Sequence, residues 1–331
     1  MERKYDRRHG RAVAALITAG FLWGTTVPLS KMALHWLPPA WLTFARFGAA
    51  ALLLLPASRA GIRAAMRPAV LASGAIGYGG SVLLQNAGIA RTSVSHAALL
   101  IGAVPVLVAI IAALWHRTLA RPIAWAGFAV SLAGVGLVTS SGSGSAGGSA
   151  AGDGLVLLSV ALSAALVVAQ VRLLRGRDPV AVTAVQFVGA AAGVLPIAVC
   201  TASVPTAPAG VGAVLATAVL AVGGTLAPFT LFAYGQRRVQ PEVAGAFVNI
   251  EPVVGAVAGV VIFGDPATLV QVAGGVAILA GIAMSSLPVL RPRHHRPVWP
   301  KLSGPDSSPE PAPAADAGNV TARSASMSKA A

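Results

Sequence analysis

The chain has 331 residues, of which 56% are hydrophobic and only 10% are charged. Soluble domains carry roughly 25% charged residues, so this composition excludes an ordinary water-soluble fold. The formal net charge of +14 sits in short segments between apolar blocks. Because it does not form one basic face with interleaved aromatic residues, a nucleic-acid-binding surface is also excluded.

The apolar residues occur in blocks, each close to the ~20 residues that a helix needs to cross the membrane. A membrane helix satisfies its backbone hydrogen bonds internally, so each block predicts a spanning helix. The predicted helices cover residues 12–32, 39–56, 68–89, 94–115, 121–139, 153–172, 180–201, 211–234, 241–263 and 268–288. The first block is too long for a signal peptide and no small-residue cleavage site follows it, so we interpret it as a retained helix. The predicted fold class is an all-α integral membrane protein with ten transmembrane helices.

Positive charge is distributed unevenly between the two sides of these helices. With the N-terminus inside, the cytoplasmic segments hold basic clusters at 3–11, 59–67, 117–121, 172–177, 237–238 and 291–301, whereas the outside segments hold only Lys31 and Arg91. This asymmetry follows the positive-inside rule and predicts that both termini are cytoplasmic. The Ala- and Gly-rich composition is typical of a GC-rich bacterial genome, which favours the bacterial inner membrane.

The segments between the helices suggest the domain organisation. Residues 140–152 are rich in Gly and Ser, as in a flexible linker, and residues 289–331 lack any apolar run, as in a disordered tail. We therefore predict a cytoplasmic N-terminal segment 1–11, a first five-helix repeat 12–139, the linker 140–152, a second five-helix repeat 153–288 and a disordered cytoplasmic tail 289–331.

The two halves of the chain can be aligned with each other. Residues 88–134 match 235–281 at a constant shift of 147, and a shift of 140 relates the helices at 39–56 and 180–201. Matched positions include Gly88/Gly235, Pro105/Pro252, Gly127/Gly274, Gly134/Gly281 and Phe47/Phe187. Each predicted repeat has five helices, which is an odd number, so the second repeat must enter the membrane from the opposite side. Inverted repeats are common in alternating-access transporters, so the repeat favours a transport function. The alternative explanation is an ancient duplication that was kept only for packing.

Several of these residues resemble a known family. The stretch from Phe21 through Trp23-Gly24 to Lys31 is similar to the first-helix motif of the drug/metabolite transporter superfamily, specifically its ten-helix EamA-type members. Phe44-Ala45-Arg46-Phe47 resembles the arginine-bearing second helix, and the strongest similarity runs from Tyr234 through Asn249-Ile250-Glu251-Pro252 to Asp265. The resemblance covers about residues 12–288. The resemblance implies a transporter of metabolites or drugs, which in this family is often an exporter.

The chain also departs from the family pattern. Trp115-His116-Arg117 stands where the family usually has a glutamate, and Asp265 replaces a second glutamate. The first-half position that matches Glu251 is Val104. These departures put the role of the first acidic residue in doubt for the first half of this chain.

Two charges lie deep inside predicted helices. An ionisable residue at the depth of Glu251 is costly and should face a cavity or a partner. Burial disfavours the charged form of the Glu251 carboxyl group, and a carboxyl group that is readily protonated suits a proton carrier. The alternative is that Glu251 forms a fixed structural ion pair beside Pro252. Arg46 could bind a carboxylate substrate with its guanidinium, pair with Glu251, or snorkel toward the interface. Gln186 occupies the matching position in the second repeat.

The remaining candidates are uncharged. Pro105 and Pro252 are expected to break their helices and expose backbone carbonyls near the repeat interface, or else simply to produce packing kinks. The candidate cavity-lining residues are Trp23, Tyr78, Gln85, Tyr234 and Asn249. The single cysteine, Cys200, forms no intramolecular disulfide, and no metal-binding Cys/His spacing occurs. We therefore predict no catalytic residues, no metal and no cofactor.

These features favour a secondary transporter, an exporter of a small metabolite or drug, with the lipid bilayer and a small-molecule substrate as partners and protons as a candidate coupling ion. The alternatives are an integral-membrane enzyme acting on a lipid-linked substrate and a non-transporting scaffold. An enzyme would need clustered acids or a nucleophile with a base, and the ten acidic residues are scattered. The sequence does not indicate the substrate, the direction of transport, the stoichiometry of a coupling ion, the oligomeric state or the role of the tail.

Overall fold

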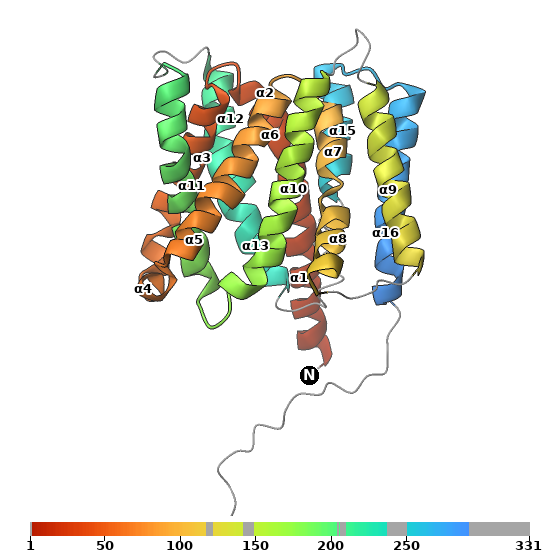
Figure 1. Cartoon of the computed structure of the whole chain (residues 1–331). Coiled ribbons are helices and arrows are strands. Elements are labelled where there is room, and N and C mark those ends of the chain that lie inside the picture. The colour runs from red at the N-terminus through yellow and green to blue at the C-terminus, as the bar shows by residue number, and fades with distance from the viewer. Residues whose placement is uncertain are drawn as a thin grey trace, which may run out of the picture. The chain divides into compact units, whose positions relative to one another are not determined.

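The computed structural model describes residues 2–116, 122–141, 149–203, 205, 210–236 and 250–290. Within these ranges all regular structure is helical and there is no strand. Figure 1 shows the helices side by side, with the N-terminus and α4 at one end of the bundle and α2 at the other. The prediction of an all-α fold is confirmed.

The helices of the first half follow the predicted apolar blocks. They are α1 (Glu2–Gly24), α2 (Thr26–Ala33), α3 (Pro39–Leu54), η1 (Pro56–Ser58), α4 (Ile62–Ala65), α5 (Pro68–Ala72), η2 (Ser73–Gly80), α6 (Ser81–Ile89), α7 (Val94–Ile101), α8 (Val104–His116) and α9 (Pro122–Ser141). Helix α1 begins ten residues before the predicted start at residue 12, because the polar N-terminal segment continues the helix. Proline stands at the first position of α3, where its missing N–H costs nothing.

The second half has the same organisation. Its helices are α10 (Ala150–Leu173), α11 (Pro179–Thr201), α12 (Val211–Ala221), η3 (Val222–Leu226), α13 (Ala227–Gln236), α15 (Ile250–Phe263) and α16 (Leu269–Leu290). Helix α10 begins earlier than predicted because Ser149 caps it, accepting a hydrogen bond from the backbone N–H of Gly152. Helix α11 is capped in the same way by Asp178.

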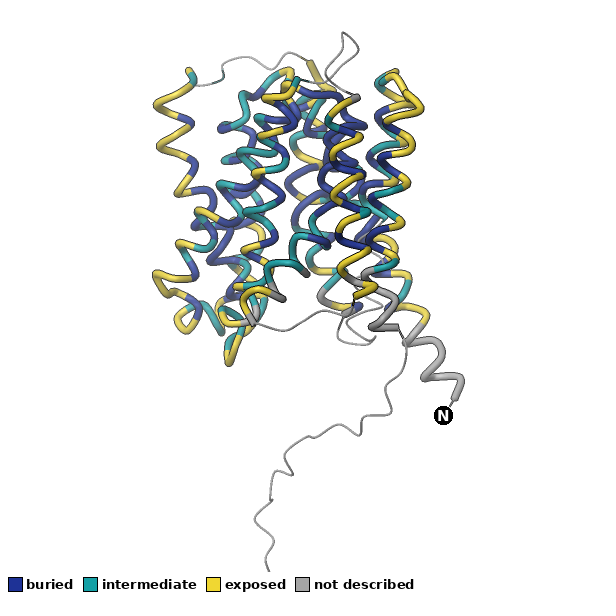
Figure 2. The backbone as a smooth tube through the Cα atoms, turned by 45° about the vertical axis from the view of Figure 1, so that its right-hand side comes forward, coloured by how far each residue is buried: buried dark blue, intermediate teal, exposed yellow. Residues whose placement is uncertain are grey.

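Four of the described helices are long and apolar enough to cross a membrane: Gly10–Ala33, Ala150–Gln170, Pro179–Thr201 and Val211–Phe232. Shorter apolar helices accompany them, among them Pro39–Leu54 and Ile250–Phe263. Large apolar side chains are exposed on the outside of the bundle, such as Leu52, Val261 and Leu269, and buried positions lie inside it (Figure 2). Such a surface suits lipid rather than water. Ten crossings stay a prediction.

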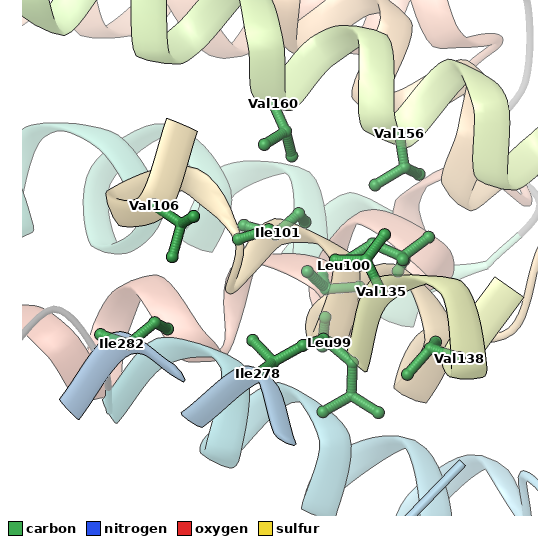
Figure 3. Close-up of a cluster of buried hydrophobic side chains, with 14 of the residues drawn as sticks. Leu99, Leu100, Ile101, Val106, Val135, Val138, Val156, Val160, Ile278 and Ile282 are labelled. Atoms are coloured by element: carbon green, nitrogen blue, oxygen red, sulfur yellow. The ribbon is translucent and has the colours of Figure 1, made fainter. Parts of the chain in front are cut away.

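The largest buried apolar cluster joins both halves of the chain. It includes Leu99, Leu100 and Ile101 of α7, Val106 of α8, Val135 and Val138 of α9, Val156 and Val160 of α10, and Ile278 and Ile282 of α16. In Figure 3 these side chains converge from the surrounding helices. Lipid tails are as apolar as these residues, so close packing rather than escape from water must hold membrane helices together.

Glycines provide that close packing between α9 and α16. A Cβ on Gly134 would lie 2.6 Å from the carbonyl oxygen of Gly274, and a Cβ on Gly281 would lie 2.5 Å from that of Gly127. The two contacts therefore use two pairs of glycines that the internal alignment matches, Gly127/Gly274 and Gly134/Gly281. Each repeat contributes the same two positions to one helix crossing.

Two π-helical turns also follow the internal alignment. The turn η2 spans Ser73–Gly80 and η3 spans Val222–Leu226, so the shift of 147 places η3 within the counterpart of η2. Helix α11 packs on η2, and α3 packs on η3. A Cβ on Gly74 would collide with the backbone carbonyl of Gln186, so glycine is required at this approach.

Replacing Gly134 should test the α9–α16 contact. Gly134→Val is expected to lower the unfolding midpoint of the purified protein in detergent, because its side chain would force the helices apart and overpacking costs ~1–3 kcal/mol. The matched control is Gly136→Val in the same helix, where a Cβ meets nothing within 4 Å. Thermal circular dichroism measures both variants, and equal losses would contradict the close contact.

Candidate functional site

Arg46 lies inside the helix bundle rather than at its lipid surface. Helix α3 holds its side chain at 7% exposure. Its Nε donates to Thr225 Oγ1 at 2.6 Å, and its Nη2 donates to the carbonyl oxygen of Gly224 at 2.9 Å. Both acceptors belong to η3, so the guanidinium of one repeat is bound by the π-helical turn of the other.

The π-helical turn explains why η3 can accept these bonds. Thr225 donates its own hydroxyl to the carbonyl of Leu220, five residues earlier, at 2.9 Å. Its oxygen therefore stays free to accept from Arg46. A π-helical turn interrupts the regular i→i−4 pattern, and such turns often occur at functional sites. The local widening leaves the Gly224 carbonyl available to a side chain from α3.

Gln186 occupies the matching position in α11 and binds the matching π-helical turn. Its Nε2 donates to Ser73 Oγ of η2 at 3.0 Å. It also exchanges two hydrogen bonds with Gln170 of α10, at 2.8 and 3.0 Å. The side chain is fully buried. The site at Arg46 therefore carries a charge. The equivalent site at Gln186 is neutral, and its two side-chain amides donate hydrogen bonds to each other.

Glu251 lies in the first turn of α15, followed directly by Pro252. It is half-buried, and its charge interacts electrostatically with that of Arg46. Among the described residues the two side chains share no hydrogen bond or close ion pair. The carboxylate and the guanidinium therefore face the same region without neutralising each other by direct contact.

Aromatic rings surround this region. Phe229 of α13 contacts Trp23 of α1 at 5.3 Å between ring centroids, Tyr78 of η2 at 5.7 Å and Phe187 of α11 at 5.9 Å. Phe47 lies 5.5 Å from Phe187, its partner in the internal alignment. The Arg46 guanidinium carbon lies 6.0 Å from the Phe47 ring centroid, within the range of a cation–π contact. Edge-to-face geometry predominates, which favours a fixed arrangement of the rings.

Other predicted site residues lie in different settings. Gln85 is half-buried on α6. Tyr234 lies near the end of α13 and is 38% exposed. Asn249 falls outside the described residues. Pro105 lies in the first turn of α8, after the break between α7 and α8 at Gly102 and Ala103.

Pro252 contributes to packing between the repeats. A Cβ on Gly102 would lie 2.8 Å from Pro252 Cβ, so the break after α7 accommodates the start of α15. Two aromatic residues of α13 were missed by the sequence analysis: Phe229, and Phe232, whose ring centroid lies 5.4 Å from that of Trp23. An aromatic residue in an apolar helix looks the same in the sequence whether it faces lipid or the interior. Thr225 was missed because a lone threonine in such a helix usually bonds its own backbone.

The apolar outer surface and the charged interior together define a helical multi-pass membrane protein. The profile of the EamA-like transporter family matches the chain twice, over residues 10–140 and 150–287. The chain therefore belongs to the EamA-like transporter family, as the sequence resemblance predicted.

Two further comparisons identify one relative by sequence and one by structure. An uncharacterised transporter of Archaeoglobus fulgidus is 39% identical over 66 residues, which is 20% of this chain and 24% of that protein. The match therefore spans about a quarter of its length. One crystal structure superposes with a TM-score of 0.61 at 22% identity, covering 84% of this chain and 96% of the other. At this identity the likeness shows a shared fold alone.

The contact between Arg46 and η3 can be tested by an isosteric change. Thr225→Val keeps the side-chain shape but leaves a buried guanidinium N–H without its acceptor, which costs ~1–3 kcal/mol. A lower unfolding midpoint in detergent is expected. Thr217→Val in α12 is the matched control, because the Thr217 hydroxyl bonds only its own helix at Ala213. Identical midpoints for the two variants would show that the Arg46–Thr225 bond contributes nothing.

Proposed function

We propose that the protein is a secondary transporter that exports a small metabolite or drug by alternating access. The observation that carries the proposal is the pair of interior charges, Arg46 and Glu251, at the junction of the two halves of the chain. Ionisable residues inside a membrane bundle are costly and typically mark a substrate or ion pathway. Aromatic rings of Trp23 and Tyr78 border the same region and offer apolar surface for a substrate.

The packing of the helices supports an inverted-repeat mechanism. Helix α1 packs on α13 and α15, and its counterpart α10 packs on α6, α7 and α8. The pairs α3–α11 and α9–α16 each join a helix to its own counterpart, and α7 packs on α15, which is the counterpart of the next helix, α8. This is the pattern that a two-fold relation between two five-helix repeats produces. Rocking of such repeats about a central site is how related architectures alternate access.

The interior charges favour a substrate that carries an anionic group. Arg46 uses Nε and Nη2 within the protein, so Nη1 is available to a ligand. A guanidinium held rigidly by two hydrogen bonds is suited to a carboxylate or phosphate oxygen. Glu251 would then receive a proton or a positively charged group of the same ligand. The competing interpretation, a purely structural Arg46–Glu251 interaction, predicts no ligand dependence on either residue.

The distribution of charge supports an N-terminus in the cytoplasm of a bacterial cell. Helix α4, which carries Arg63, lies at the same end of the bundle as the N-terminus (Figure 1). Helix α2, which ends near Lys31, lies at the other end. Basic residues favour the cytoplasmic side. Export would then carry the substrate from the α4 end toward the α2 end.

Ligand binding is the first test. Thermal unfolding of the purified protein should be measured with a panel of amino acids, organic acids, nucleosides and cationic drugs. A ligand at 100 times its dissociation constant stabilises by ~2.7 kcal/mol. We expect a shift with an anionic compound that is lost in Arg46→Ala. Arg91→Ala is the matched control, because Arg91 is exposed just after α6 and donates to the Ala87 carbonyl of that helix. A shift that survives Arg46→Ala would place the ligand elsewhere.

Proton coupling is tested separately in proteoliposomes loaded with the compound that binds. We expect a pH gradient to drive its transport in the wild type and not in Glu251→Gln, because the amide cannot exchange a proton. Asp178→Asn at the exposed start of α11 is the control and should transport normally. Gradient-driven transport by Glu251→Gln would refute the role of this carboxylate. Turnover of a lipid-linked substrate by the purified protein would instead favour the enzyme alternative.

A further inference from the structure

Five arginines gather at one corner of the bundle, at the end that holds the N-terminus. Three lie in the segment from η1 to the start of α5, and two lie in the turn between α10 and α11. They are Arg59, Arg63, Arg67, Arg175 and Arg177, and we call this set the arginine corner. The short helix α4, in the first of these segments, lies at the outer edge of the bundle (Figure 1). The corner therefore lies at the periphery of the protein.

Close packing holds the two segments together. A Cβ on Gly61 would lie 3.0 Å from the Cβ atoms of both Asp178 and Ala181, so the turn before α4 rests directly on the start of α11. Beneath this contact, α4 and α5 share a buried apolar cluster with the first turns of α11. The backbone positions of the arginines are therefore fixed relative to one another, although the two segments are more than a hundred residues apart in the sequence.

The positive charge of this corner is not neutralised within the part of the chain that the structure describes. Residues 56–67 and 174–178 contain a single acidic residue, Asp178. Its Oδ1 already accepts a hydrogen bond from the backbone N–H of Val180, as the cap of α11. None of the five arginines forms an ion pair with another described residue. The corner therefore carries a large excess of positive charge.

Exposed apolar side chains lie among these charges. Met66, between Arg63 and Arg67, is 47% exposed, and Val180 at the start of α11 is 38% exposed. Four of the arginines are exposed as well, and Arg177 is half-buried. Guanidinium groups beside exposed apolar side chains match both parts of an anionic phospholipid, since its phosphate carries negative charge and its acyl chains are apolar.

A neighbouring contact indicates the level of the membrane surface at this end. The guanidinium carbon of Arg172, in the last turn of α10, lies 5.0 Å from the ring centroid of Trp115 in α8. Both side chains are exposed. Tryptophan is enriched where the bilayer meets water, and the long arginine side chain reaches the same level. Arg175 follows three residues after Arg172, so the arginine corner lies near the level of the lipid phosphates.

We propose that the arginine corner is a binding site for an anionic phospholipid. Guanidinium groups bind phosphate oxygens through paired, charge-assisted hydrogen bonds, and the exposed side chains of Met66 and Val180 contact the acyl chains. The site is separate from Arg46 and Glu251. It requires only that the bundle lies in a membrane, so it goes beyond the proposed transport function and does not depend on the direction of transport.

The positive-inside rule explains why basic residues lie at this end of the bundle but not why they are held in one place. A topology signal acts during membrane insertion and needs no fixed geometry. Basic residues that served only as topology signals would attract anionic lipid in proportion to their number. A binding site instead requires that arginines of the corner contribute more than equally exposed arginines elsewhere.

The test measures lipid binding to the purified full-length protein in a non-ionic detergent. Phosphatidylglycerol is titrated, and native mass spectrometry resolves the first bound lipid and gives its dissociation constant. Phosphatidylcholine with the same acyl chains tests the headgroup charge, and glycerol 3-phosphate tests the phosphate without acyl chains. We expect phosphatidylglycerol to bind at least tenfold more tightly than either compound.

Arg63→Gln/Arg67→Gln removes two charges from the corner. A basic residue near an anionic membrane surface contributes about a factor of 5 in affinity, so the affinity for phosphatidylglycerol should fall about 25-fold. The matched control is Arg11→Gln/Arg91→Gln, which removes two exposed arginines outside the corner and should bind like the wild type. Arg175→Gln, in the other segment, should lower the affinity about fivefold, so the test does not rest on the folding of one variant.

Three results would overturn the proposal. They are equal affinities for phosphatidylglycerol and phosphatidylcholine, equal losses in the corner variant and its control, and binding of glycerol 3-phosphate as tight as that of the lipid. The second result would mean that basic residues attract anionic lipid without a specific site. Lipid binding needs no transported compound, so a failed lipid site can be distinguished from a failure of the transport function.

Discussion

A guanidinium inside a membrane bundle must find its hydrogen-bond acceptors in the protein, because lipid offers none. Arg46 meets this requirement with the hydroxyl of Thr225 and the carbonyl of Gly224, both in the π-helical turn η3. In a regular α-helix each mid-helix carbonyl accepts from the N–H four residues later, so the turn is what makes η3 an acceptor. The position of α3 against η3, the aromatic rings beside it and the location of the interior charge all depend on this contact.

The equivalent contact in the other repeat shows how the two halves of a duplicated structure differ in charge. Gln186 reaches η2 as Arg46 reaches η3, so both repeats retained the backbone arrangement. The side chains then diverged. Gln186 and Gln170 satisfy each other in a closed neutral pair, whereas Arg46 keeps a charge and an available N–H group. In the proposed transport cycle, the symmetry of the packing would allow two related conformations, and the asymmetry of the charges would give a single place for a ligand.

The sequence predicts the helices well because each spanning segment is specified locally, by a run of apolar residues. It also identifies Arg46 and Glu251, since a charge within such a run is conspicuous, and the internal alignment identifies the glycine pairs of α9 and α16. It could not predict the partners of these residues. Lys31 meets Thr92 across 61 residues of sequence and Gln271 meets Ser95 across 176. Such pairings arise from tertiary packing, and serine, threonine and glutamine in apolar helices give no local signal of them.

Helix α15 links the interior charges with the start of α7, where Asp265 accepts a hydrogen bond from the backbone N–H of Ser95. Glu251 lies in its first turn and Asp265 lies just beyond its end, so its 14 residues form a rod of about 21 Å between the two sites. Gly255 and Gly259 let this rod lie directly on α7, since a Cβ on either would collide with Ala98 or Ser95. Close packing of this kind resists independent sliding of the two helices. A displacement of α15 at Glu251 is therefore expected to reach Ser95, so in the proposed transport cycle α15 would carry a change at the interior charges to the start of α7.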